Sequence, residues 1–477
     1  MMPFRLPAPA RFALPLILLL AQLETPDASA AAIWTNAASG LWRDAENWSG
    51  GNLPSLGGVY VTNAGSKTVT IDALTPSGNL SINSLNIWAA PNFTNTLLLS
   101  DLGVNKTLLV SNSTLDVRMR GALQVANSSL VVTSAFAGGG VSFNIWAGSV
   151  TLDSGSILLR EPASAIYPSM VTRVGRTNAA TLTINGGSML SSMMQVGQAG
   201  QLNSRSHGTI RMTGGILTVP GELSIGTSVH CTGVVDMVGG QLVVPNNLTN
   251  ITRIGDQGAA WMTVSNATAF LGNVSVGRHD TAQGTLVLLA GGLVSTTDDF
   301  SIGRFGNSTG TVFVADGQLS VTNHPIWVGR EGTGQLVVSN GLVSASELRV
   351  AAELTNTASG FVLLAGGTTI ASAKCTVGNP AFSTGQVAVA GGSLVVSNAD
   401  QTAILDIAGG TLTLNGGSIA ADSLLVTNET GAMIFDGGAL FTSGTVVSNG
   451  QPFVLGDGVT AAVMYLRGGT HLFADGL

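Results

Sequence analysis

The chain has 477 residues, of which 45% are hydrophobic, 9% charged and 5% aromatic, and its formal net charge is −7. This hydrophobicity with so little charge excludes an intrinsically disordered chain, and the 63 glycines lack the every-third spacing of collagen. A mildly acidic, charge-poor chain also argues against nucleic acid as a partner.

The first 30 residues have the pattern of a secretory leader. Arg5 and Arg11 supply positive charge, residues 12–21 form a short apolar run, and Ala28-Ser29-Ala30 matches a small-x-small cleavage site. The run is too short for a membrane anchor and contains Pro15, so we predict a signal peptide cleaved after Ala30. We therefore expect a secreted or bacterial cell-surface protein with no integral membrane segment in the mature chain.

A tryptophan cluster follows within residues 31–75, which we assign to an N-terminal cap and the first strands. Three of the seven tryptophans, Trp34, Trp42 and Trp48, are grouped here. The first coil of a repeat protein must cover its apolar end, which favours a buried cap. Exposed indole faces would instead stack on sugar rings, which makes the same three tryptophans candidate ligand-binding residues.

Residues 76–170 are predicted to form irregular β coils, and residues 171–477 a regular glycine-rich repeat. The eight steps from Gly175 to Gly378 average about 25 residues. An apolar residue followed by Gly marks each repeat, with Val350-Ala351 filling one gap: Val174-Gly175, Val196-Gly197, Ile225-Gly226, Ile254-Gly255, Val276-Gly277, Ile302-Gly303, Val328-Gly329 and Val377-Gly378. A small-residue pair lies between these markers, as at Gly186-Gly187, Gly214-Gly215, Gly239-Gly240, Gly291-Gly292 and Asp316-Gly317.

Residues between the two phrases alternate between apolar and polar, as in Thr181-Leu182-Thr183-Ile184, which is strand periodicity with one buried face. Short strands in a repeat of about 25 residues favour a right-handed parallel β-helix (β-solenoid) with Val, Ile, Leu, Ala and Thr inside. A β-propeller needs about 40 to 50 residues per blade, so the period is too short for one. The mature chain would make roughly 18 coils and a rod about 85 Å long.

The residue after the apolar-Gly phrase is Arg278, Arg304 and Arg330 in three consecutive repeats. These arginines should form a ladder with a spacing of about 4.8 Å, which would favour an anionic ligand or simply extend into water. Arg176 holds the same place further up the chain, and Asp256 precedes Arg278 in the same row, where it offsets part of the repulsion.

Sugar cleavage requires paired carboxylates, or carboxylates with Lys or Arg, on adjacent coils. The densest candidates are Arg278-His279-Asp280 with Asp298-Asp299 and Arg304 one repeat later. No metal-ligand spacing is present, and we expect no catalytic residue, metal or cofactor. Cys231 and Cys375 lie about six repeats apart, which is too far for a disulfide, so we assign them to packing positions.

The opening with Trp34, Trp42, Asn47-Trp48 and Pro54, followed by loose Gly-Gly β repeats, resembles large secreted bacterial proteins with autotransporter-associated β-strand repeats. These are common among surface proteins that end in a PEP-CTERM sorting tail. The resemblance covers about residues 33–477, implies a parallel β-helix outside the cell, and brings no catalytic residues. The sequence stops at Leu477 in mid-repeat, so it looks like a chain that lacks its C-terminal part.

We therefore expect a structural or adhesin-like surface protein without catalytic activity. The alternative is a β-helix that binds or degrades polysaccharide. Extracellular polysaccharide or other cell-surface proteins are the expected partners.

Overall fold

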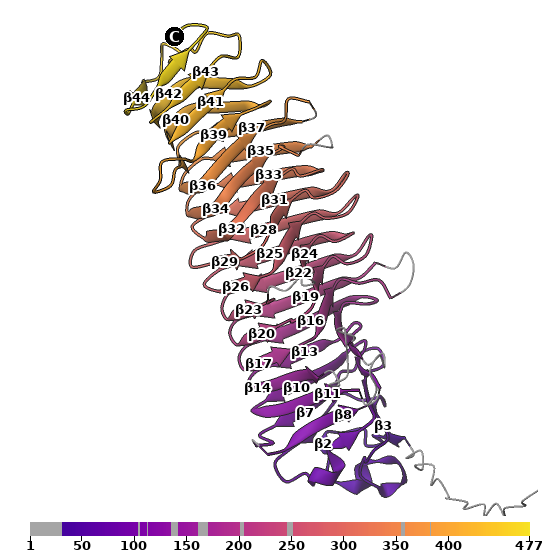
Figure 1. Cartoon of the computed structure of the whole chain (residues 1–477). Coiled ribbons are helices and arrows are strands. Elements are labelled where there is room, and N and C mark those ends of the chain that lie inside the picture. Colours follow the sequence, from indigo (N-terminus) through magenta and orange to yellow (C-terminus); the bar gives the residue numbers. More distant parts are fainter. Residues whose placement is uncertain are drawn as a thin grey trace, which may run out of the picture.

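The protein is an all-β parallel solenoid of about 16 turns, with about 26 residues in each turn (Figure 1). This computed structural model describes residues 31–477 except 104, 112, 135–141, 161–169, 201–204, 246–250, 354–357 and 382. The predicted signal peptide lies outside the described residues. The turns stack into one rod, from the indigo N-terminal end to the yellow C-terminal end of Figure 1.

Each turn contributes strands to three columns, in which every strand pairs in parallel with its counterpart in the next turn. Five long strands bend around a corner and belong to two columns: β32 (Gln318–Val328), β34 (Leu342–Val350), β36 (Thr368–Val377), β40 (Thr411–Ala421) and β42 (Ala432–Thr442). The first three join the third column to the first, and the other two join the second to the third.

The first column contains, besides those parts of long strands, β1 (Ala32–Ile33), β3 (Gly58–Val61), β6 (Ser84–Ile87), β9 (Leu115–Val117), β12 (Ser142–Ile145), β15 (Val171–Val174), β18 (Met193–Val196), β21 (Leu223–Ile225), β24 (Ile251–Ile254), β27 (Asn273–Val276), β30 (Phe300–Ile302), β39 (Ile404–Ile407), β41 (Ser423–Val426), β43 (Thr445–Val447) and β45 (His471–Phe473).

The second column contains β2 (Gly40–Leu41), β4 (Lys67–Ile71), β7 (Asn95–Ser100), β10 (Gly121–Ala126), β13 (Ser149–Leu152), β16 (Ala179–Ile184), β19 (His207–Met212), β22 (Thr232–Met237), β25 (Ala259–Val264), β28 (Gln283–Leu288), β31 (Thr309–Val314), β33 (Thr333–Val338), β35 (Ser359–Leu364) and β37 (Thr384–Val389).

The third column contains β5 (Ser81–Ile82), β8 (Thr107–Ser111), β11 (Ser128–Thr133), β14 (Gly155–Arg160), β17 (Ser188–Leu190), β20 (Ile216–Thr218), β23 (Gln241–Val243), β26 (Thr268–Leu271), β29 (Leu293–Thr296), β38 (Ser393–Val396) and β44 (Ala462–Leu466). Short 3₁₀ turns at η1 (Ala45–Asn47), η2 (Ser49–Gly51) and η3 (Ser77–Asn79) are the helical elements of the described chain. None of its helices is long and apolar enough to cross a membrane.

The core is a single continuous cluster inside the rod, because alternate residues of every strand point inward. In the first column the last residue of each strand from β3 to β43 is a buried aliphatic side chain that stacks on its equivalent one turn away. Val276, Ile302 and Val328 are consecutive members of this stack, and each is 0% exposed. The predicted interior of branched aliphatic residues is confirmed.

Glycine occupies the first corner, between the first and second columns, because the backbones of adjacent turns come into contact there. Gly303 has a φ of 68°, which L side chains rarely adopt, and a Cβ built on it would lie 2.2 Å from the Thr333 carbonyl oxygen of the next turn. Ala351 holds the same place one repeat after Gly329 and adopts a φ of 47°. The apolar-Gly phrase therefore marks this corner.

The small-residue pairs mark the second corner, between the second and third columns. Gly187, Gly215 and Gly240 have φ values of 70°, 71° and 80° there, and Asp316 takes the same conformation at 69°. Short polar residues tolerate this left-handed conformation, so Asp316 takes the place that Gly291, with a φ of 68°, holds in the preceding turn. Both sequence phrases therefore correspond to turns of the solenoid.

The tryptophan cluster packs at the N-terminal end of the rod. Trp34 and Trp42 are 0% exposed and Trp48 is 2% exposed, and both contact Trp48 edge-on, with ring centroids 5.1 and 4.8 Å away. The Trp48 indole N–H donates to the carbonyl of Trp42 at 2.8 Å, and the Trp42 indole N–H donates to that of Asn79 at 3.2 Å. Their burial fits a cap and leaves no indole face open to a sugar.

Candidate functional site

The outer surface of the first strand column, here called the first-column face, gathers much of the charge of a charge-poor chain. Nine of the 19 lysines and arginines lie on it within the described chain: Arg118, Arg173, Arg176, Arg253, Arg278, Arg304, Arg330, Arg349 and Lys374. This concentration makes the face the strongest candidate for a functional surface.

The arginines lie flat along the face because small residues stand beneath them. Ser275 and Ser301 are paired neighbours that point outward between inward aliphatic residues, yet both are 0% exposed. Arg304 covers this row, since its Nη1 donates to Ser275 Oγ at 3.0 Å and to Asn273 Oδ1 at 3.3 Å. An arginine that follows the corner thus folds back over the strand of the preceding turn.

The predicted arginine row is present. The backbone N–H groups of Arg278, Arg304 and Arg330 donate to Gly255, Gly277 and Gly303 of the preceding turn at 2.8, 2.9 and 3.0 Å. Consecutive arginines therefore occupy equivalent corner positions in successive turns, whereas their side chains take different partners. Their role in binding a ligand remains a prediction.

The central cluster consists of Glu222, Arg253, Asp256, Arg278 and His279. Asp256 is its hub: its oxygens lie 3.4 Å from Arg278 Nη1, 3.5 Å from Arg253 Nη1 and 3.6 Å from His279 Nε2. Arg253 also pairs with Glu222 from the preceding turn. Asp256 therefore offsets part of the repulsion between the arginines, as the sequence predicted. Within the cluster, negative charges lie next to positive ones.

Burial shifts the titration of this cluster. It raises the pKa of Glu222, and the nearby Arg253 opposes that shift. It lowers the pKa of His279, and Arg278 lowers it further, so this imidazole is neutral at physiological pH. The pKa values of Arg278 and Arg304 are also lowered, first by burial and then by neighbouring arginines.

The downstream cluster consists of Asp298, Asp299, His324, Arg330 and Glu353. Arg330 lies 3.4 Å from Glu353 and 3.7 Å from Asp299, and His324 Nδ1 lies 3.5 Å from Asp299. Donor atoms of Asp298, Asp299 and His324 all lie within 4.8 Å of one another, which is the only such metal-competent group among the described residues. Sequence reasoning missed this group, because His324 follows Asp299 by a full turn.

Further along the face, two more ion pairs continue the compensation. Arg349 lies 2.6 Å from Glu347, and Lys374 lies 2.9 Å from Asp406. Trp327 packs between Arg330 and Arg349, whose guanidinium carbons lie 4.8 and 4.4 Å from its ring centroid. From the central cluster onward, therefore, most cations on the face have a carboxylate partner.

The N-terminal cluster consists of Asp116, Arg118, Asn144, Arg173 and Arg176. Only Arg118 has a carboxylate partner among the described residues, because it lies 2.7 Å from Asp116. Arg173 and Arg176 instead approach the same amide oxygen of Asn144, at 3.5 and 3.4 Å. This cluster combines three cations with one anion, which is an excess of positive charge in an acidic protein.

Sequence reasoning did not find the N-terminal cluster, although a signal was present. Trp88 and Trp146 directly follow Ile87 and Ile145, at the place that Gly175 occupies after Val174. A bulky aromatic residue in a corner position that is glycine in most of the regular repeats indicates that these turns are built differently.

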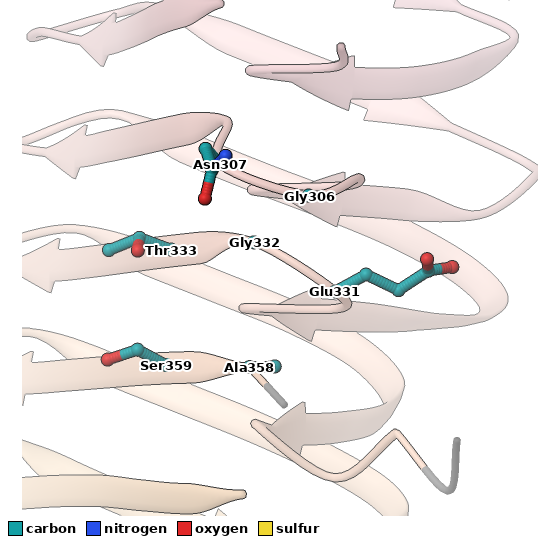
Figure 2. Close-up of a pocket in the computed structure, with 7 residues that line it drawn as sticks. All are labelled: Gly306, Asn307, Glu331, Gly332, Thr333, Ala358 and Ser359. Carbon is teal, nitrogen blue, oxygen red and sulfur yellow. The ribbon is translucent and has the colours of Figure 1, made fainter. Parts of the chain in front are cut away.

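A depression of about 500 Å³ lies at the first corner of later turns (Figure 2). Its lining combines backbone with short side chains such as Asn307, Thr333 and Ser359 from successive turns, and Figure 2 shows the Glu331 side chain extending away from them. The described lining offers no paired catalytic groups, so the first-column face remains the better candidate.

Cys231 and Cys375 are buried and are not joined in a disulfide, as the spacing predicted. Burial raises the pKa of the Cys375 thiol to about 12, so it carries no nucleophilic thiolate at neutral pH. Comparison of this chain with protein families, curated proteins and solved structures found no match.

Proposed function

We propose that the protein is an exported rod with a structural or adhesive role outside the cell. The observation that carries the proposal is the continuous solenoid, whose single core cluster extends from Trp34 to Phe453. Backbone hydrogen bonds between successive turns make such a rod stiff, and about 16 turns at about 4.8 Å give a length of about 77 Å.

The sequence features of the N-terminus support the export part of this proposal. Residues 1–30 have the pattern of a cleavable leader, and the opening of the mature chain resembles autotransporter-associated repeat proteins of the PEP-CTERM kind. A repeating outer surface also suits weak contacts made many times along one polymer or surface.

Export and shape are tested with the chain expressed in a bacterial host with and without residues 1–30. We expect the full chain outside the cytoplasm with Ala31 as its first residue, and the shortened chain inside. Electron microscopy should show rods of about 77 Å. Cytoplasmic retention of the full chain would contradict export, and globular particles would contradict the structural role.

Adhesion is tested separately with beads that carry the purified rod. They should be retained on an extracellular polysaccharide matrix more strongly than beads that carry albumin. Equal retention would remove the adhesive part of the proposal and leave only the structural part.

Polysaccharide binding is the second candidate function, and the N-terminal cluster favours it. Aromatic rings, polar side chains and unbalanced arginines meet on one face there, which is the combination that recognises a charged sugar polymer.

A further inference from the structure

An alternating row of aromatic and cationic residues follows the first corner through the N-terminal turns. Trp88, Arg118 and Trp146 stand in successive turns, since Arg118 N–H donates to Ile87 and Trp146 N–H to Val117, both at 2.8 Å. Arg176 belongs to the next turn, and its N–H donates to the Trp146 carbonyl at 3.2 Å. The spacing of these side chains along the rod is therefore that of the turns, about 4.8 Å.

Arginine and tryptophan are in contact within this row. The guanidinium carbons of Arg176 and Arg118 lie 4.1 and 5.5 Å from the Trp146 ring centroid. Such stacking holds guanidinium groups in place without neutralising their charge. The row is therefore pre-organised for a planar anionic group.

The polar partners of Arg173 and Arg176 in the described chain are neutral. Arg173 Nε donates to Gln195 Oε1 at 3.1 Å, and both arginines approach Asn144 Oδ1. Burial lowers the pKa of Arg173, and the positive charge of Arg176 lowers it further. Burial also lowers the pKa of Arg176, whereas the negative charge of Asp116 raises it. A bound carboxylate would offset the positive charge of the pair.

Two buried donors, one in this pair and one in the adjoining tryptophan, have no hydrogen-bond partner in the described structure. They are Nε of Arg176 and the indole Nε1 of Trp146. Buried donors are normally satisfied, so these two atoms leave hydrogen-bonding capacity of the cluster unused, as Nε does in Arg253, Arg278 and Arg304.

A pocket of about 370 Å³ adjoins the cluster and shares Asp116 and Arg118 with it. Tyr60 and Trp88 supply aromatic rings, Ser84 and Asn86 supply polar groups, and Trp88 is 39% exposed. This volume lies in the range of small-molecule sites. Tyr60, Asn86, Asp116, Asn144 and Arg173 are register partners in successive strands of the first column, so pocket and cluster together extend over about 19 Å.

We propose that this part of the first-column face binds an acidic polysaccharide through its uronic-acid carboxylates. Arg173 and Arg176 bind a carboxylate, and Trp88 and Tyr60 stack on sugar rings. Asn86 and Asp116 accept hydrogen bonds from sugar hydroxyl groups. The carboxylate of Asp116 disfavours a phosphate at the pocket and favours a ligand rich in hydroxyl groups. The extent of the surface suits an oligosaccharide rather than a single sugar.

This inference rests on the proposed extracellular role, and binding to the mature chain of residues 31–477 tests it. The probes are oligogalacturonate, neutral dextran and dextran sulfate, and the readouts are calorimetry and tryptophan fluorescence. We expect oligogalacturonate to bind and to change the fluorescence through Trp88 and Trp146, with no binding of dextran. Dextran sulfate that binds as tightly as oligogalacturonate would overturn the proposal, because it would indicate unspecific attraction of polyanions.

The double variant Arg173→Gln with Arg176→Gln should bind oligogalacturonate at least tenfold more weakly. Trp88→Ala should also bind more weakly, although its exposed ring leaves the melting temperature nearly unchanged. The matched control Arg211→Gln, on the second column, should bind like the parent protein. Unchanged affinity in both the double variant and Trp88→Ala would overturn the proposed site.

The failure of this inference can be separated from that of the proposed function. A protein that is exported as a rod but binds no oligogalacturonate in its folded state would refute the sugar site alone. Circular dichroism and melting curves confirm that each variant is folded before its affinity is compared.

Discussion

The first corner and the first-column face adjoin in every turn, yet they restrict the sequence in different ways. At the corner, backbone meets backbone, so the side chain at Gly303 is limited to a hydrogen atom. On the face, side chains meet only one another, and Arg, Ser, Trp and Asp all occur in one register row. The corner therefore restricts the residue wherever the next turn packs as closely as it does at Gly303, whereas the face tolerates many residue types.

The face itself also has two different parts. In the central cluster Asp256 compensates two arginines, whereas Arg173 and Arg176 share only a neutral amide oxygen. The first arrangement has its countercharge within the chain, whereas among the described residues the second pair has no carboxylate within ion-pair distance. The proposed anion site therefore lies on a different segment of the face from the compensated cluster.

The largest effect is expected from Gly303→Ala at the corner. The new Cβ would meet the Thr333 carbonyl oxygen at 2.2 Å and would stand at a φ of 68°, so the free energy of unfolding should fall by about 3 kcal/mol or more. Hydrogen exchange around β30 and β31 would locate the loss, which need not be global in a repeat protein.

Gly450→Ala is the matched control for that experiment. Gly450 has a similar φ of 77°, but a Cβ there would have no atom within 4 Å. This substitution should lower the free energy of unfolding by only about 1 kcal/mol, because an alanine there has to adopt a left-handed φ but meets no neighbouring atom. If the two variants lost equal stability, close contact between turns would not be what requires glycine at the corner.

On the face, Asp256→Asn should reduce the free energy of unfolding by about 2 kcal/mol, between the values for exposed and buried ion pairs. It leaves the guanidinium groups of Arg253 and Arg278, whose side chains are 16% and 17% exposed, with less negative charge nearby. Urea denaturation measures the change, and Asp236→Asn on the second column serves as the control. If Asp256→Asn lowered the free energy of unfolding no more than the control does, the ion pairs of the central cluster would not stabilise the protein.

Behind the face, Cys375 makes the core sensitive to alkali. Its pKa is about 12 in the folded protein and 9.0 ordinarily, so the unfolded chain loses the thiol proton first. Stability should therefore fall as pH rises above 9, by about 1.4 kcal/mol at pH 10, until the folded pKa is passed. Cys375→Val should lack this component, and denaturation of both proteins from pH 8 to 10.5 isolates it. Parallel pH profiles would contradict the expectation.

The smallest effect is expected from Ala351→Gly, which restores the usual corner residue. Relief of the left-handed conformation outweighs the added freedom of the unfolded chain, so stability should rise by roughly 0.5 kcal/mol. If Ala351→Gly instead lowered the stability measured in denaturant, the contacts of the Ala351 methyl group would outweigh the cost of its left-handed conformation.

Much of the fold could be predicted because its signals are local. The alternation in Thr181-Leu182-Thr183-Ile184 and the phrase Ile302-Gly303 depend on neighbouring residues, and both appear in the structure as strand β16 and the first corner. The Arg278, Arg304 and Arg330 row was predicted because three nearly equal repeats place them in register. The side-chain partners were not predicted, because each arginine reaches a different residue of an adjoining turn.

The sequence by itself determined the strand alternation, the approximate period and the glycine corners, since these follow from the pleat and from permitted backbone angles. Only the tertiary structure decided which charges meet. Arg118, Trp146 and Arg176 belong to turns that differ in their number of residues. A constant repeat length therefore does not predict which of these side chains meet, and their contacts are seen only in the structure. The same stacking buries the indoles of Trp34, Trp42 and Trp48 at the end of the rod, whereas the Trp88 ring is exposed in the corner row that Arg118 and Trp146 continue.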